Sequence, residues 1–231
     1  MKGIFVAGTD TGVGKTLFSA ALLLHLAQAG VRAAACKPVS AGCRREGCRL
    51  VNADAELLAA TAPLQRPLEI VNPFALEPAI APHIAAAEAG VELQAAMLAD
   101  ACHRAGDGAD FTLVEGAGGW RVPLNARETL ADVARLLEFP VVLVVGLRLG
   151  CLNHALLSAE AIRADGLELA GWVANPIDPA MPRLEENISA LEARLGAPLL
   201  ARLPHCRHPG ELARAREAAA VLRRITAFTY D

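Results

Sequence analysis

Residues 4–16 of the chain read IFVAGTDTGVGKT, so a short apolar run leads into a glycine-rich segment that ends in Gly14, Lys15 and Thr16. Apolar residues then recur at helical spacing, at positions 17, 20, 21, 24 and 27, and Gly30 stands just past that pattern. A strand that turns through glycines into a helix exposes backbone N–H groups beside the positive end of the helix dipole, where the phosphates of a nucleotide bind. We therefore predict a nucleotide-binding loop over residues 8–16.

Further apolar runs of strand length follow along the chain, separated by helical patterns. The predicted strands cover residues 33–36, 111–114, 141–145, 170–174 and 199–203, and the predicted helices cover residues 54–61, 92–105, 130–137, 153–164 and 182–195. Runs that are apolar on both faces suit central parallel strands covered by helices. Residues 63–82 carry several prolines and little periodicity, which indicates a long loop. The pattern predicts an α/β fold in a single domain, residues 1–231, with a doubly wound, mainly parallel sheet and helices on both faces, as in P-loop NTPases.

The charge distribution argues against binding through a broad charged surface. The chain has 231 residues, is 54% hydrophobic and carries a formal net charge of -3, with 22 basic and 25 acidic residues interspersed. We therefore expect no nucleic-acid partner and no membrane partner, and no apolar run reaches the roughly 20 residues of a membrane span. The N-terminal residues lack a secretory signal pattern, and the six cysteines are scattered. These features predict reduced thiols and a cytoplasmic location.

Two side chains of the glycine-rich loop would act on a nucleotide. In loops of this kind the lysine, here Lys15, reaches the β- and γ-phosphates, and the following hydroxyl, here Thr16, ligates magnesium. The spacing departs from the usual pattern, because Gly8 and Gly14 flank five residues instead of four and Thr9 occupies a position expected for glycine. The residues predicted to surround the phosphates are Gly12, Val13, Gly14, Lys15, Thr16 and Leu17.

Charged residues also stand where other predicted elements begin or end. Glu115 follows the strand at 111–114 and precedes a glycine run that lets backbone approach phosphate. Lys37 follows the second strand, at the sheet edge where ligands collect. Magnesium needs oxygen ligands such as Glu115 and Asp54. The residues by themselves also allow purely structural roles. Glu115 could be a carboxylate in a turn, Asp54 could cap a helix, and Lys37 could be a solvated surface charge.

A set of short motifs links these positions. They are residues 8–16, Lys37-Pro38-Val39, Asn72-Pro73, Pro82-His83, residues 114–119, residues 150–154 and residues 171–175. In order and spacing they resemble the dethiobiotin synthetase family, from the first strand to about Pro204. The combination is far more specific than any single motif.

The resemblance implies an ATP- and magnesium-dependent ligase of biotin biosynthesis. Members of the family carboxylate 7,8-diaminononanoate on an amine with CO2, activate the carbamate with ATP as a carbamic-phosphoric anhydride, and let the second amine close the ureido ring. The products are dethiobiotin, ADP and phosphate. The resemblance also implies a homodimer.

The resemblance assigns roles to individual residues. It implies that Thr16, Asp54 and Glu115 hold magnesium, that Lys15 and Lys37 neutralise the transferring phosphoryl group and the carbamate, and that Thr11 helps to place the γ-phosphate. These roles are charge stabilisation and positioning, the main resources for phosphoryl transfer. The further nucleotide contacts that it implies are Gly116, Ala117, Gly118, Asn175, Pro176, Pro204, His205, Cys206 and Glu211.

Three of the implied contacts keep an alternative. An asparagine amide suits a base edge, but Asn175 could equally turn the chain after a strand. The family usually has a serine or threonine two residues after Val39, facing the substrate, whereas this chain has Ser40 followed by Ala41. Either Ser40 substitutes for that hydroxyl or the contact is lost.

The substrate carboxylate is expected at a helix start. By resemblance the contacts are Gly150, Cys151, Leu152 and Asn153 of the partner subunit. A glycine turn that opens a helix near Asn153 would present N–H groups and a positive dipole end to an anion. The alternative is an ordinary helix start with Asn153 as its cap.

Other classes of protein fit the sequence less well. A partitioning or septum-positioning ATPase of the same superfamily generally carries an additional lysine near the start of the loop, and residues 9–13 contain none. The C-terminal residues form no convincing membrane anchor. A related amide-forming ligase of cofactor synthesis lacks the combination of Lys37-Pro38 with residues 150–154. Zinc at His205, Cys206 and His208 lacks a second ligand pair.

Overall fold

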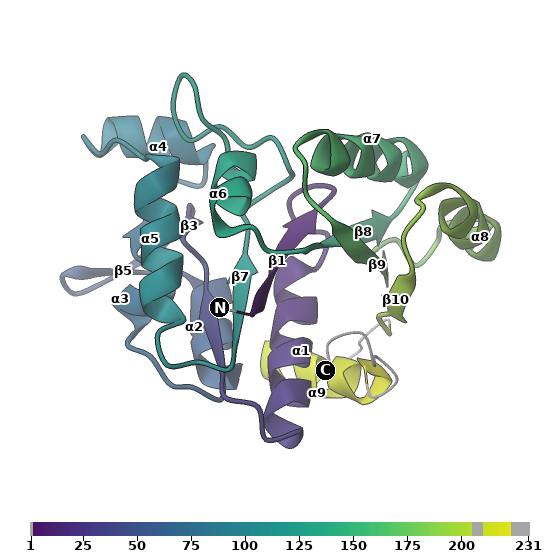
Figure 1. The fold of residues 1–231 in the computed structure, drawn as a ribbon, viewed down its shortest axis with the longest axis horizontal. Coiled ribbons are helices and arrows are strands. Elements are labelled where there is room, and N and C mark those ends of the chain that lie inside the picture. The colour runs from purple at the N-terminus through teal and green to yellow at the C-terminus, as the bar shows by residue number, and fades with distance from the viewer. Residues whose placement is uncertain (1, 205–209, 223–231) are drawn as a thin grey trace.

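A parallel β-sheet forms the centre of the protein, seen in a computed structural model that describes residues 2–204 and 210–222. Its six strands lie in the order β10-β9-β8-β1-β7-β2 (Figure 1). The strands are β1 (Gly3–Gly8), β2 (Ala33–Cys36), β7 (Phe111–Glu115), β8 (Val141–Leu147), β9 (Leu169–Pro176) and β10 (Leu199–Arg202). The predicted strands are confirmed, with ends that differ from the prediction by at most a few residues.

Alternate side chains of the central strands pack into two apolar cores, one on each face of the sheet. Along β1, Ile4 and Val6 belong to one core, whereas Phe5 and Ala7 belong to the other. Successive side chains of a strand point to opposite faces, so a strand with a core on each side is apolar at every position. This is why residues 4–7 form an unbroken apolar run.

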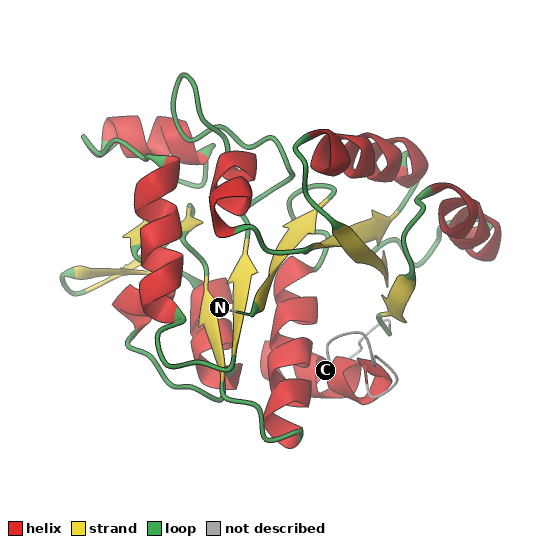
Figure 2. Ribbon diagram, viewed as in Figure 1, coloured by secondary structure: helices red, strands yellow, loops and turns green. Residues whose placement is uncertain are grey.

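Helices cover both faces of the sheet (Figure 2). The core that contains Ile4 also receives side chains from α1 (Lys15–Gln28), α2 (Ala53–Thr61) and α9 (Glu211–Leu222). The core that contains Phe5 receives side chains from α4 (Pro82–Glu88), α5 (Ala95–Ala105), α6 (Leu130–Leu137), α7 (Cys151–Ala164) and α8 (Leu184–Arg194). The doubly wound arrangement is confirmed.

The segment 63–82 differs from the long loop that its sequence predicts. It contains a one-turn helix, α3 (Leu68–Val71), and a short strand, β6 (Phe74–Ala75), which pairs in parallel with β3 (Val39–Ser40). The prolines hid this pairing because they remove local periodicity, while the partner strand lies more than thirty residues earlier in the chain. A second small sheet is the hairpin of β4 (Arg44–Glu46) and β5 (Arg49–Val51).

Four helices begin at residues other than those predicted: α2 begins one residue early at Ala53, α8 begins two residues late at Leu184, and α5 and α7 differ for reasons that the structure shows. α5 begins at Ala95, three residues late, because Leu93 is buried and the Ala95 N–H is capped by Glu128 Oε2 at 3.1 Å. α7 begins at Cys151, two residues early, because Gly150 takes a left-handed conformation with φ 96° and starts the helix directly. Both differences come from backbone geometry at the helix start.

The sheet brings the ends of three strands together. Val6 of β1 lies beside Glu115 of β7, and Val114 of β7 lies beside Cys36 of β2. Because the strands are parallel, the phosphate loop after β1, Glu115 at the end of β7 and Lys37 after β2 share one edge. The strand order also reverses at β1, and crevices at such points are where open α/β sheets bind ligands.

The described residues also show whether the chain has membrane-spanning helices or disulfides. Within residues 2–204 and 210–222 no helix is both long and apolar enough to cross a membrane. The cysteines in these ranges form no disulfide, as the sequence predicts: Cys36, Cys43, Cys48, Cys102 and Cys151.

Candidate active site

The phosphate loop depends on glycine at its last turn before the helix. Gly14 is the N-cap of α1 and has φ 95°, a conformation that side chains rarely adopt. A Cβ atom at Gly14 would also lie 2.1 Å from Nδ2 of Asn175. That amide donates a hydrogen bond to Val13 O at 2.8 Å, so a side chain of β9 holds the backbone of the loop. Asn175 therefore does not turn the chain; it is a buried residue inside β9 that braces the loop.

Lys15 is held by neutral oxygen atoms. Its Nζ donates to Asp10 O at 2.9 Å and to Gly118 O at 2.6 Å, and the residue is only 7% exposed. Burial lowers the pKa of Lys15 from 10.5 to about 8, since the nearby carboxylates, Glu115 first among them, only partly offset it. The positive charge of Lys15 is therefore only partly compensated by the groups around it.

Glu115 joins the phosphate loop to the Lys37 segment. Its Oε1 accepts hydrogen bonds from Lys37 Nζ at 2.6 Å and from Thr16 Oγ1 at 2.9 Å, and the residue is fully buried. Lys37 Nζ also lies 3.0 Å from Asp54 Oδ2. Burial alone would lower the pKa of Lys37, but Glu115 and Asp54 outweigh it and raise that pKa above its usual value. Lys37 is therefore a buried cation with two carboxylate partners, and not a solvated charge.

The oxygen atoms around Lys37 fit a magnesium ion. Glu115 Oε2 is buried and has no hydrogen-bond partner among the described residues. The Asp54 carboxylate lies 3.0 Å from Lys37 Nζ, and the Thr16 hydroxyl lies 2.9 Å from Glu115 Oε1. Carboxylate and hydroxyl oxygens are ligands that magnesium prefers. Asp54 is also not the helix cap, because Asn52 caps α2 by accepting from the Ala55 N–H at 3.2 Å.

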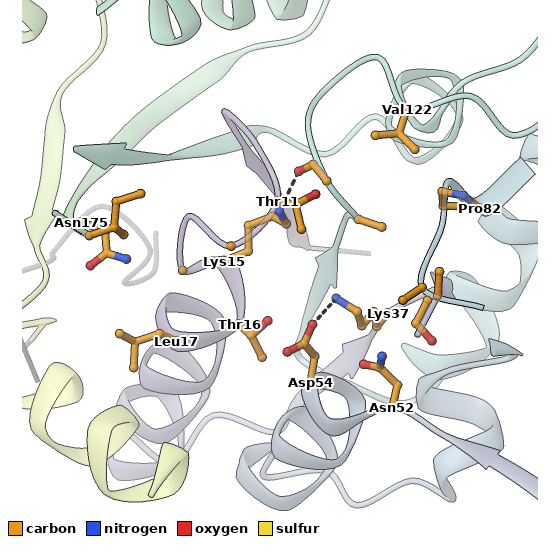
Figure 3. A pocket seen from close by; sticks show the side chains of 18 of the residues that line it. Thr11, Lys15, Thr16, Leu17, Lys37, Asn52, Asp54, Pro82, Val122 and Asn175 are labelled. Carbon is orange, nitrogen blue, oxygen red and sulfur yellow. Dashed lines mark hydrogen bonds and ion pairs between the residues drawn. The ribbon is translucent and has the colours of Figure 1, made fainter. Parts of the chain in front are cut away.

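A cavity of about 920 Å³ runs across these residues. Figure 3 shows Leu17 and Asn175 on one side of the phosphate loop and Lys37 and Pro82 on the other, with Lys15 near the middle. The predicted site residues that line the cavity are Thr11, Gly12, Gly14, Lys15, Thr16, Leu17, Lys37, Ser40, Ala41, Asp54, Ala117, Gly118, Asn175, Pro176 and Pro204. One continuous cavity thus borders both the phosphate loop and the Lys37 segment.

Comparison with known proteins identifies the family. Residues 2–209 match the model of a family described as an AAA domain. The ATP-dependent dethiobiotin synthetase BioD of Pseudomonas paraeruginosa is 59% identical over 214 residues, which cover 92% of this chain and 94% of that protein. The protein of the same name from Cellvibrio japonicus is 56% identical over 203 residues, covering 88% and 89% of the two chains. The chain belongs to the dethiobiotin synthetase family.

Solved structures confirm the fold of this dethiobiotin synthetase family member. MinD of Pyrococcus horikoshii, solved with Mg-ADP, superposes with a TM-score of 0.62 at 16% identity and covers 96% of this chain and 93% of its own. A ParA family ATPase of Chlorobium tepidum gives 0.59 at 15% identity and covers 96% of both chains. At these identities the likeness concerns the P-loop NTPase fold alone.

Some of the predicted site residues do not line the cavity. Val13, Glu115 and Gly116 do not line the cavity: Val13 packs in the core, the Glu115 side chain is fully buried, and the Gly116 N–H donates to Val6 O at 3.0 Å. Residues 150–153 lie outside the cavity wall, and the Cys151 side chain is buried in the core. His205 and Cys206 lie outside the described residues, as does the side chain of Glu211, the first residue of α9.

The start of α7 shows which residue caps the helix and which backbone N–H groups are already bonded. The N-cap is Gly150 rather than Asn153, and the Cys151 N–H already donates to Arg148 O at 3.0 Å. Any substrate contact of Cys151 would not involve its side chain. Among the described residues, the N–H groups of this first turn that have no main-chain acceptor are those of Leu152 and Asn153.

Sequence reasoning missed part of the wall of the cavity. Ile80, Pro82 and Val122 form an apolar wall near Lys37, and Arg214 of α9 borders the end with Pro204. Pro82 belongs to a family motif, which was a usable signal. The others carry no local pattern that marks them as contacts, because only the fold brings them to the cavity.

Proposed function

We propose that this chain converts 7,8-diaminononanoate, CO2 and ATP into dethiobiotin, ADP and phosphate. The proposal rests on the family to which the chain belongs and on relatives named ATP-dependent dethiobiotin synthetases. Because ATP and reduced thiols are both found in the cytoplasm, we place the reaction there. The observation that carries the proposal is that Lys15, Thr16, Lys37 and Asp54 line one cavity, where Thr16 and Lys37 both donate to the buried carboxylate of Glu115 behind the cavity wall.

The phosphate loop would bind and orient the triphosphate of ATP. Backbone N–H groups at the start of α1 face the anion together with the helix dipole. Lys15 lies where it can exchange its carbonyl partners, Asp10 O and Gly118 O, for phosphate oxygens. Thr11 lines the same part of the cavity and would help to place the γ-phosphate. The adenine would lie toward Asn175 and Pro176.

The other end of the cavity would bind the diamine. Ile80, Pro82 and Val122 offer an apolar surface that suits a methylene chain. Lys37 stands between this surface and the phosphate loop, so its ammonium group can stabilise the negative charge of the carbamate and of the transferring phosphoryl group. With this order along the cavity, the two reactants would lie end to end.

Thr16, Asp54 and Glu115 would hold a magnesium ion in this site. When bound, the ion supplies positive charge that offsets the charge of the phosphates. Glu115 stands at the end of β7, and its Oε2 is a buried oxygen without a hydrogen-bond partner among the described residues, while Oε1 is bonded to Lys37.

The test is a product assay with the purified chain. It is incubated with ATP, magnesium, bicarbonate and 7,8-diaminononanoate, and the cyclic urea is sought by mass spectrometry. We expect ATP consumption that depends on the diamine and yields dethiobiotin. ATP hydrolysis that ignores the diamine and gives no cyclic urea would point to a switch ATPase and reject the proposal.

We further propose a homodimer in which α7 of one subunit receives the substrate carboxylate in the site of the other. Residues 150–153 lie outside the cavity of their own chain, although the family likeness makes them substrate contacts. Leu149 is 95% exposed and Leu157 is 56% exposed, so this region offers apolar surface to a second copy. A shared site explains both observations.

Subunit complementation tests the shared site. Lys37→Ala and Asn153→Glu variants, each expected to be inactive, are unfolded and refolded together. In a mixed dimer both lesions fall in one site and the other site is intact, so random pairing should restore about a quarter of the activity. No recovery, despite mixed dimers shown by mass, would reject the shared site.

A further inference from the structure

Ser40 has a hydroxyl at the cavity wall, but its proton is already used inside the protein. Ser40 Oγ donates to Asn72 Oδ1 at 2.7 Å, and the residue is 1% exposed. Cys43 Sγ lies 3.2 Å from the same oxygen, on the buried side. A hydroxyl has a single proton to donate. Ser40 therefore has none left for a substrate.

Asn72 connects this hydroxyl with the catalytic lysine. Its Nδ2 donates to Lys37 O at 2.7 Å, and the residue is buried. The carbonyl of Lys37 can only accept, so the amide must turn its nitrogen to Lys37 and its oxygen to Ser40. One amide thus bridges two residues of the segment that carries the lysine.

Main-chain bonds run beside this bridge. The Lys37 N–H donates to Val71 O at 2.7 Å, and the Leu76 N–H donates to Ser40 O at 2.9 Å. Segments 37–40 and 71–76 are therefore joined along their length by main-chain hydrogen bonds. The Ser40–Asn72 hydrogen bond adds a side-chain link between the same two segments. Removal of the Ser40 donor would leave Asn72 Oδ1 buried without a partner, which is costly in a site of low dielectric.

We propose that Ser40 is a positioning residue, which acts through Asn72 to hold the backbone of Lys37 so that its ammonium group stays between Glu115 and Asp54. The diamine then meets the methyl group of Ala41 at the next position. This inference rests on the proposed function, since it assigns Ser40 a role in the same site. The hydroxyl that is displaced by one position in the sequence does not replace a substrate contact; it supports the lysine.

Steady-state kinetics of Ser40→Ala provide the first test. We expect kcat for dethiobiotin to fall about tenfold while KM for the diamine changes less than about twofold, because a displaced Lys37 weakens the transition state more than substrate binding. Ser19→Ala is the matched control. It also removes a fully buried serine hydroxyl, but Ser19 Oγ has no hydrogen-bond partner among the described residues. Its kinetics should equal those of the unmodified chain.

A double-mutant cycle tests the route through Asn72. If Ser40 acts through this amide, Ser40→Ala combined with Asn72→Ala should be no slower than Asn72→Ala alone. Losses that multiply would overturn the proposal. So would a raised KM for the diamine with normal kcat, which indicates substrate contact, or a lower melting temperature with normal kcat and KM, which indicates a structural role only.

Amide hydrogen exchange separates this inference from the proposed function. In Ser40→Ala the N–H groups of Lys37 and Leu76 should exchange at least about fivefold faster than in the unmodified chain, and in Ser19→Ala they should not. If the unmodified chain makes no dethiobiotin, the proposed function fails, while faster exchange still supports the hold on Lys37. Unchanged exchange would overturn the role of Ser40 whatever the product assay gives.

Discussion

The phosphate loop and the Lys37 segment meet at one sheet edge, yet they hold their lysines in opposite ways. Lys15 is surrounded by main-chain carbonyls, whereas Lys37 lies between two carboxylates. Both ammonium groups are buried, but the pKa of Lys15 is lowered by burial and that of Lys37 is raised by its partners. Burial by itself therefore does not decide the charge of a lysine; the charge of the first neighbours does.

The difference separates two tasks. A lysine among neutral oxygens has an unsatisfied charge, so an incoming phosphate improves its environment and gains affinity. A lysine already paired with carboxylates gains less from a bound anion and is suited to hold its position through the reaction. We therefore expect changes at Lys15 to affect nucleotide binding first and changes at Lys37 to affect turnover first.

The largest effect should follow from Lys37→Ala. We expect turnover to fall at least about a hundredfold, because the charge is used mainly in the transition state. Glu115 would be left buried without its cation, so the free energy of unfolding should also fall by about 3 kcal/mol. Dethiobiotin formation and urea denaturation measure the two effects. Near-normal turnover would show that the Lys37 segment has no part in the chemistry.

Glu115→Gln addresses the residue that the two regions share. The amide oxygen can still accept from Thr16, but the charge that attracts magnesium is lost, so the magnesium concentration for half-maximal activity should rise about tenfold. Thr16→Val removes an uncharged ligand and should produce a smaller rise. The magnesium titration is repeated for nucleotide binding. If both variants keep the original magnesium dependence, the assigned ligand set is wrong.

The pH dependence of nucleotide binding tests Lys15 directly. With a pKa of about 8, Lys15 is charged at pH 7 and mostly neutral at pH 9, so the Kd for ATP should rise between these values, approaching tenfold per pH unit above 8. A bound phosphate favours the charged form, hence binding should take up a proton near pH 8. Calorimetry in buffers of different ionisation enthalpy measures this uptake. Lys15→Met should abolish it, and a pH dependence that survives in this variant must come from another group.

The smallest expected effect concerns the brace beneath the phosphate loop. Asn175→Ala removes the hydrogen bond to Val13 O, so ATP binding should weaken about threefold to tenfold while kcat at saturating ATP falls less. Isothermal titration and kinetics distinguish the two quantities. A fall in kcat that exceeds the change in binding would place Asn175 with Lys37 rather than with the loop.

The sequence predicted those parts of the molecule whose signals are local. The strands of the sheet, α1 and the phosphate loop follow from apolar runs and glycines close together in the chain, and the structure confirms them. The partners of Lys37 did not follow, because Glu115 lies 78 residues away in the chain and meets it only through the pairing of β2 with β7. Family resemblance supplied what local pattern could not.

Short elements were the other gap. β3 (Val39–Ser40) and β6 (Phe74–Ala75) are too short to show alternation, and they exist because each is the partner of the other. The sequence likewise did not decide whether the Ser40 hydroxyl contacts the substrate, since nothing nearby in the chain shows that it donates a hydrogen bond to Asn72. Features that depend on a distant partner require the three-dimensional structure.

The two tryptophans provide different spectroscopic signals. Trp172 is fully buried in β9, whereas Trp120 follows the glycine run at 116–119, packs edge-on against Phe5 at 6.0 Å between ring centroids and donates to Asp165 Oδ2 at 2.7 Å. Two residues on, Val122 lines the cavity. Fluorescence emission from Trp120 should therefore shift when the cavity is filled, against a constant background from Trp172. Replacement of Trp120 by phenylalanine should remove that shift and leave only the constant emission of Trp172.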